Sequence, residues 1–269
     1  MRKIKLLLVI GLLGGLTAGC GESISDVCGT EARCTGKKLS GMIYKRAEMY
    51  RTGEGVEKDP VKAVQLHRKA AERGHLGSQY WLAESYRTGV GVEKDPAKAV
   101  QLHRKSAEKG HLGAQYWLAD SYRTGEGVAK DPAKAVQLYR VAAERGHRGA
   151  QYWLAESYRT GEGVGKDPAM AAQWYGKAAE KGHLGAQYWL AESYRNGEGV
   201  AKDPAKAVEL YRKAAEEGHL GAQYWLAESY RKGEGVEKDV AKAAEWYYKA
   251  AQQGHVVARE KLEQLGGSF

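Results

Sequence analysis

The sequence repeats every 36 residues from Gly41 onward, and this periodicity constrains the fold more than any other feature. Six full copies run from 41 to 256, and residues 257–265 keep the register of a seventh first segment. Tandem units of this length stack on their neighbours, because none can bury its apolar side alone. A chain of 269 residues could otherwise form one or two globular domains. The repeats predict one elongated array instead.

The copy at 77–112 predicts a pair of helices. Leu82 and Tyr86 lie in helical spacing in the first segment, and two glycines then end this helix. Asp95 can act as an N-cap, and Pro96 suits the first position of a second helix of about 14 residues. We predict an all-α fold, a right-handed α-solenoid of six helical hairpins plus a C-terminal capping helix.

Four motifs of the copy are similar to those of the Sel-1-like repeat, a branch of the tetratricopeptide-like α-solenoids. They are Ala-Gln-Tyr-x-Leu-x-x-x-Tyr, Gly-x-Gly-Val, Asp-Pro-x-x-Ala and Lys-Ala-Ala-Glu-x-Gly-His. The resemblance covers residues 41–265. It implies a scaffold that binds other proteins, without a shared catalytic chemistry. Exported bacterial members are linked to envelope signalling, virulence and immunity against toxins delivered by type VI secretion.

Residues 1–19 have the pattern of a lipoprotein signal peptide. A basic start precedes an apolar stretch that is too short to span a bilayer, and small residues precede Cys20. Residues 16–20 resemble the bacterial lipobox, after which a lipidated Cys20 becomes the first residue. Gly21 stands where an inner-membrane retention signal would have Asp. The resemblance implies an outer-membrane anchor with the body facing the periplasm; the alternative is an ordinary signal peptide with Cys20 incidental.

Residues 20–40 form the expected lipidated N-terminal segment, and residues 266–269 form a C-terminal tail. In an oxidising compartment, Cys28 and Cys34 could close a small disulfide loop. The segment would have to bend, because a regular helix separates these residues by about 9 Å. Two thiolates without a nearby histidine are too few for a metal site, so we expect no metal.

The charge pattern disfavours a nucleic-acid partner. Three of the 42 basic residues lie in the leader, which leaves 39 against 33 acidic residues, and no basic run occurs. We expect membrane contact through the lipid anchor only, and a monomer when the protein is free.

The histidines occupy two fixed positions of the repeat. One follows the end of the second helix, at His75, His111, His147, His183, His219 and His255. The other lies within the second helix, as His67 and His103, and is tyrosine in later copies. Exchange between His and Tyr favours packing or hydrogen bonding over a metal or a general base. The Gly-Glu-Gly segments indicate turns, and no catalytic constellation stands outside the repeat, so we predict no enzyme and no cofactor.

The arc of each first helix that stacking leaves unused carries one Tyr, one Trp, one acidic residue and one Arg. Aromatic and arginine side chains are typical of protein-binding surfaces. The candidate partner-binding residues are Tyr80, Trp81, Glu84, Arg87, Tyr116, Trp117, Asp120, Arg123, Tyr152, Trp153, Glu156, Arg159, Tyr188, Trp189, Glu192, Arg195, Tyr224, Trp225, Glu228 and Arg231. The alternative is that the indoles only pack between adjacent first helices.

We therefore expect a periplasm-facing lipoprotein that binds a protein partner through a concave groove. Resemblance and location favour an immunity or inhibitor protein that neutralises a type VI secretion effector, for instance a phospholipase. One alternative is an envelope scaffold or regulatory adaptor with an endogenous partner. A peptidoglycan-binding protein or cell-wall enzyme is a minor alternative.

Overall fold

The computed structural model describes residues 36–266, which contain thirteen α-helices and no strand. The expected signal peptide, Cys20, Cys28, Cys34 and the tail from 267 lie outside these residues. The chain divides after His75 into two compact units, which we call unit 1 and unit 2.

Unit 1 contains one helical hairpin, formed by α2 (Gly36–Thr52) and α3 (Pro60–Glu72). α2 begins before the first repeat at 41. Leu39 and Ile43 of α2 are buried together with Ala70 of α3. The turn is fixed by Asp59, whose carboxylate accepts a hydrogen bond from the Lys62 N–H at 2.9 Å.

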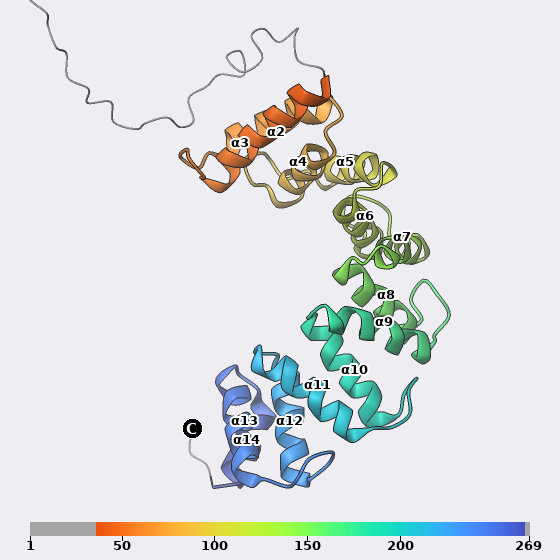
Figure 1. Cartoon of the computed structure of the whole chain (residues 1–269), viewed down its shortest axis with the longest axis vertical. Helices are drawn as coiled ribbons and strands as arrows, with labels where there is room; N and C mark the ends of the chain where they lie inside the picture. The colour runs from red at the N-terminus through yellow and green to blue at the C-terminus, as the bar shows by residue number, and fades with distance from the viewer. Residues whose placement is uncertain (1–35, 267–269) are drawn as a thin grey trace, which may run out of the picture. The chain divides into compact units, whose positions relative to one another are not determined.

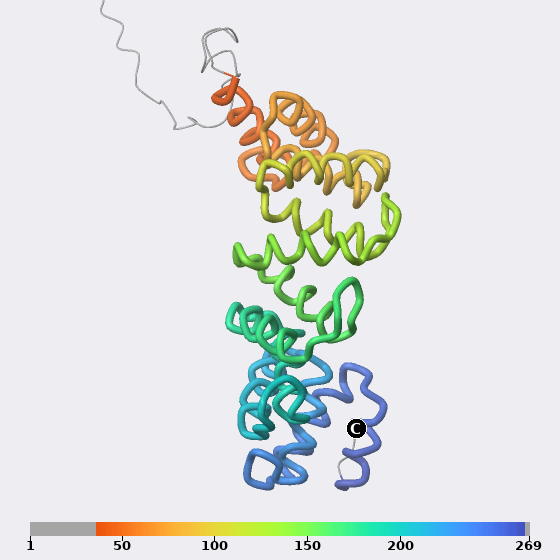
Figure 2. The backbone as a smooth tube through the Cα atoms, turned by 90° about the vertical axis from the view of Figure 1, so that its right-hand side faces the viewer, coloured from red at the N-terminus to blue at the C-terminus, as the bar shows by residue number. Residues whose placement is uncertain are grey.

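Unit 2 contains five more hairpins and a last helix (Figure 1). We call the first helix of each hairpin the A helix and the second the B helix. The helices are α4 (Leu76–Thr88), α5 (Pro96–Glu108), α6 (Leu112–Thr124), α7 (Pro132–Glu144), α8 (Arg148–Thr160), α9 (Pro168–Glu180), α10 (Leu184–Asn196), α11 (Pro204–Glu216), α12 (Leu220–Lys232), α13 (Val240–Gln252) and α14 (Val256–Gln264). Within unit 2, every B helix also packs on the helix that follows it, as the tube trace in Figure 2 shows. The predicted solenoid of six hairpins plus a C-terminal helix is confirmed.

The helix ends of unit 2 follow from short sequence signals. In α7, the Asp131 side chain accepts a hydrogen bond from the Lys134 N–H at 3.0 Å, and Pro132 opens the helix, as the sequence predicted. The A helix α8 begins differently, because Nδ1 of His147 accepts from the Ala150 N–H at 3.1 Å. The repeated Gly-His histidine is thus the N-cap of the next A helix.

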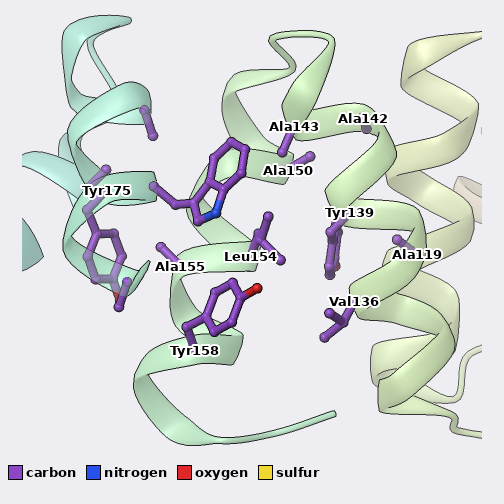
Figure 3. Packing of buried hydrophobic residues seen from close by; sticks show 14 of the residues in the cluster. Ala119, Val136, Tyr139, Ala142, Ala143, Ala150, Leu154, Ala155, Tyr158 and Tyr175 are labelled. Atoms are coloured by element: carbon purple, nitrogen blue, oxygen red, sulfur yellow. The ribbon is translucent and has the colours of Figure 1, made fainter. Parts of the chain in front are cut away.

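The core lies where successive hairpins meet. Leu154 and Ala155 of α8 are fully buried, and Figure 3 shows them between Tyr139 of α7 and Tyr175 of α9. The alanine permits a close approach of the helices, while the leucine and the rings fill the remaining volume. α8 therefore stabilises both the hairpin to which it belongs and the one before it.

Because the histidines of the folded chain resist protonation, we expect the free energy of unfolding to fall in mild acid. Burial lowers the pKa of four of the capping histidines, His111, His147, His183 and His219, and also that of His75. Burial likewise lowers the pKa of the helix-interior His67 to about 4. The unfolded chain takes up protons near pH 6.5 while the folded chain resists them, so stability is full above pH 6.5 and declines as pH falls toward the folded-state pKa values. For His67 alone the loss approaches about 3 kcal/mol.

Urea unfolding followed by circular dichroism at pH 7.5, 6.0 and 5.0 measures this decline. His147→Asn is the matched control, because asparagine caps a helix without titrating in this range. We expect a smaller pH dependence of the midpoint for this variant. An equal midpoint at pH 7.5 and 5.0 in the natural protein would contradict the prediction.

Candidate functional site

The predicted partner-binding residues of α8 are held by the B helix of the same hairpin. Glu156 and Arg159 lie one turn apart and form an ion pair at 2.6 Å. Glu156 also accepts a hydrogen bond from the Tyr175 hydroxyl, and Arg159 Nε donates to the Tyr175 oxygen at 3.2 Å. A buried tyrosine of α9 thus fixes both charged side chains of the A helix.

The same three-residue group recurs along unit 2. Its other members are Asp120 with Arg123 and Tyr139, Glu192 with Arg195 and Tyr211, and Glu228 with Arg231 and Tyr247. In the first hairpin of unit 2 the tyrosine is replaced by His103, whose Nε2 lies 3.2 Å from Glu84. Within unit 1, Nε2 of His67 lies 3.3 Å from Glu48. Both ring types present a polar atom to the carboxylate, and the tyrosine hydroxyls donate a hydrogen bond to it.

Burial and hydrogen bonding shift the pKa values of Glu228 and Tyr175 in opposite directions. For Glu228, burial opposes ionisation, but hydrogen bonds from Arg231 and Tyr247 outweigh it and lower the pKa to about 2. Burial raises the pKa of Tyr175, and its hydrogen bond to Glu156 raises it further. At neutral pH the Glu228 carboxylate is therefore charged and the Tyr175 phenol is protonated. This pairing serves structure, since a general acid or base has a pKa near the working pH.

The tryptophans join one A helix to the next. The guanidinium of Arg123 lies 3.9 Å from the ring centroid of Trp153. The same cation–π contact is made by Arg87 with Trp117, Arg159 with Trp189, and Arg195 with Trp225, at 3.7–4.1 Å. The indoles therefore have a packing role at these junctions.

The tyrosines of the A helices stack on the capping histidines. The ring centroids of Tyr116 and His147 are 4.7 Å apart, at an interplanar angle of 25°. Gly149 makes this stack possible, because a Cβ at this residue would lie 3.0 Å from the Tyr116 ring. In unit 2 the structure thus brings the predicted Tyr, Trp, acidic and Arg side chains together. We call this set the A-helix strip.

The A-helix strip remains partly accessible. The side chains of Arg159 and Arg195 are 34% and 27% exposed, whereas those of Glu156 and Glu192 are 13% and 12% exposed. The tryptophans are half-buried. A partner approaching this face would meet arginines and indole edges more than carboxylates.

Two polar pockets open along the strip in the same register. The first has a volume of about 370 Å³ and is lined by Arg159, Lys166, Tyr175, Trp189 and Glu192, among others. The second, of about 350 Å³, is lined by residues that lie 36 positions further on, including Arg195, Lys202 and Tyr211. The pockets share eight repeat positions, represented in the first by Arg159, Lys166, Pro168, Ala171, Tyr175, Ser193, Asn196 and Glu198.

Sequence reasoning missed the contribution of the turns to these pockets. Lys166 and Glu198 come from the segments that connect A and B helices, outside the helical arc used for the prediction. Their signal was present in the 36-residue period, since Lys202 and Glu234 repeat them. Between residues 36 and 266, no group of three His, Cys, Asp or Glu side chains could hold a metal. Among the described helices, none is long and apolar enough to cross a membrane.

The stacked hairpins and their accessible strip define a helical-repeat protein with a protein-interaction fold. The chain belongs to the Sel1 repeat family. The Sel1 repeat family model matches residues 42–75, 77–111, 113–147, 149–183, 185–219 and 221–255. This is a family of protein-interaction scaffolds that are generally non-enzymatic.

Solved structures show the same architecture. A protective antigen from uropathogenic Escherichia coli strains, with an SLR fold, is 34% identical over 85% of this chain at a TM-score of 0.81. This chain spans 50% of that protein. A Sel1 repeat protein from Oxalobacter formigenes is 33% identical, with 86% of this chain and 68% of that chain covered and a TM-score of 0.74.

An immunity protein from Pseudomonas aeruginosa is more distant. It is 24% identical, with 79% of this chain and 81% of that chain covered and a TM-score of 0.46. A likeness this weak says nothing about the partner of this chain. No curated protein matches the sequence.

Proposed function

We propose that this protein is an exported lipoprotein, anchored in the outer membrane through Cys20 and facing the periplasm, that binds a protein partner through the groove formed by its A helices. The lipobox-like residues 16–20 support the anchor. Mass spectrometry of the mature protein tests it, and an unacylated chain beginning at Cys20 would overturn it. The Sel1 repeat family supports the binding role.

The recurrence of the two pockets carries the binding proposal. A partner segment lying along the strip would meet the same arginine, lysine, tyrosine and glutamate at an interval of one hairpin. The ion pairs with Glu156 and Glu192 already hold Arg159 and Arg195 in place, so less conformational entropy is lost on binding. Pre-ordered arginines beside indole rings match the composition of binding hot spots.

Charge reversal at the pocket rims tests this proposal without disturbing the ion pairs. Lys166→Glu with Lys202→Glu changes two exposed turn residues that line the two pockets. We expect the Kd for the partner captured from envelope extracts to rise about tenfold or more. The urea midpoint should stay close to that of the natural protein, because exposed charges contribute little to stability.

Lys69→Glu with Lys105→Glu is the matched control. These lysines are exposed on B helices and line neither pocket. Partner affinity should be nearly unchanged in this variant. Equal affinity of the pocket variant and the control would contradict binding through the strip.

Within this role, we propose that the partner is a toxin delivered by type VI secretion, such as a phospholipase that attacks the membrane carrying the anchor. The resemblance of exported family members and the proposed location support this step. Deletion of the gene should increase the sensitivity of cells to the co-encoded effector. Unchanged sensitivity, together with capture of a housekeeping envelope protein from resting cells, would favour an envelope scaffold or adaptor instead.

A further inference from the structure

Three junctions between hairpins of unit 2 are closed by the same hydrogen bond. At each, an arginine of the B helix donates its Nη2–H to the hydroxyl of a tyrosine near the end of the next A helix. The pairs are Arg104 with Tyr122 at 3.0 Å, Arg140 with Tyr158 at 2.8 Å, and Arg212 with Tyr230 at 3.1 Å. These arginine clamps lie outside the A-helix strip.

The junction between α9 and α10 lacks this clamp. Gly176 occupies the arginine position, and among the described residues no side chain donates a hydrogen bond to the Tyr194 hydroxyl. Ala172 also replaces the valine found in the three clamped hairpins. A Cβ on Gly176 would meet nothing within 4 Å. Glycine is unfavourable inside a helix, so Gly176 opens space at the junction without stabilising α9.

A pocket of about 410 Å³ occupies the space left by these two substitutions. We call it the Gly176 notch; its walls include Ala172, Gly176, Leu190, Tyr194 and Leu210. Apolar atoms form most of its surface, and the hydroxyl of Tyr194 is not engaged by an arginine. The notch therefore combines mostly apolar walls with the Tyr194 hydroxyl, which can accept a hydrogen bond.

We propose that the Gly176 notch receives an arginine side chain of a protein partner. The other junctions show what this position accommodates, because there the guanidinium of an arginine on the B helix reaches the tyrosine hydroxyl. An arginine supplied by another protein can make the same contacts at Tyr194. The inference rests on the proposed protein-binding role, but it names a second contact with different chemistry.

The charges around the notch are compatible with a guanidinium. The ammonium of Lys177 lies 3.8 Å from the Trp174 ring centroid, and Lys213 is paired with Glu209 at 2.6 Å. Glu180 adds a carboxylate to the rim. Two of the three clamped hairpins likewise place a lysine directly after the arginine, as Arg104-Lys105 and Arg212-Lys213.

The n-butylguanidinium ion is a probe that tests the notch without a partner. In protein with ¹³C-labelled tyrosine rings, we expect this ion to shift the Tyr194 signals at millimolar concentration, and n-butylammonium to shift them at least several-fold less. Gly176→Arg should abolish the response and raise the urea midpoint, because the arginine of the variant fills the notch and pairs with Tyr194. A Tyr194 signal that does not shift when n-butylguanidinium is added would overturn the proposal.

The double variant Arg140→Gly with Val136→Ala should create a second notch at another junction. It reproduces the two substitutions of the notch at the clamped Tyr158, so n-butylguanidinium should then shift Tyr158 as well and restore part of the lost urea midpoint. A response at Tyr158 in this variant without one at Tyr194 in the natural protein would count against the natural notch.

Measurements of partner affinity can distinguish the notch contact from binding through the A-helix strip. Gly176→Arg should raise the Kd for the partner about tenfold, with the strip intact. Lys166→Glu with Lys202→Glu should leave the n-butylguanidinium response unchanged. If Gly176→Arg binds the partner as tightly as the natural protein, the arginine contact is wrong while the strip proposal stands. If binding is lost only in the notch variant, the strip proposal is wrong while the arginine contact stands.

Discussion

Gly163→Ala is expected to lower the free energy of unfolding by about 3 kcal/mol or more. Gly163 has a φ of +77°, and a Cβ there would lie 2.3 Å from the Pro132 carbonyl oxygen and 2.5 Å from its carbon. The obstacle is backbone at the start of α7, in the preceding hairpin, so no side-chain rotation can relieve it. The helix start or the turn must move.

Gly161→Ala in the same turn isolates the cost of the backbone conformation. Gly161 has a φ of +82°, but the nearest atom to its Cβ would be the Cβ of Lys166 at 3.5 Å. Only the left-handed conformation is strained there, which costs about 1 kcal/mol. Urea unfolding followed by circular dichroism measures both variants. Equal losses would show that the approach of Gly163 to Pro132 does not limit stacking.

The hairpin architecture could be predicted because its signals are local. Asp131, Pro132 and Gly161 set the ends of helices through their own backbone preferences and nearest neighbours. The repeats then predicted that successive hairpins stack on one another, because an isolated hairpin cannot bury its apolar side. The histidine N-cap was less visible, since Gly-His could mark either the end of one helix or the start of the next.

The environment of the A-helix strip could not be predicted from one helix. Helical spacing correctly separated Leu154 and Ala155 from Trp153 and Glu156, but it does not show what the neighbouring hairpins place against those side chains. Arg123, which lies over Trp153, comes from the preceding hairpin. The Gly176 notch had a visible signal, a glycine where four other copies have arginine, but its meaning depended on the tyrosine across the junction.

Glu156→Lys is expected to lower the free energy of unfolding by about 3 kcal/mol or more. The Glu156 side chain is 13% exposed, and its carboxylate accepts from both Arg159 and the buried Tyr175. A lysine places a second cation beside Arg159 and leaves the Tyr175 hydroxyl without its acceptor. The displaced Arg159 also lies 4.1 Å from the Trp189 ring, so tryptophan fluorescence should change with the midpoint.

Glu162→Lys makes the same change of charge at an exposed ion pair. Glu162 lies 2.8 Å from Lys130, with the two side chains 48% and 56% exposed, so the expected loss is below about 1 kcal/mol. Urea midpoints of the two variants, measured at one salt concentration, provide the comparison. Similar losses would mean that the carboxylate of Glu156 does not hold the hairpin together. A large loss at Glu156 alone means that substitutions there disturb folding and binding together, whereas Lys166 and Lys202 at the pocket rims can report on binding separately.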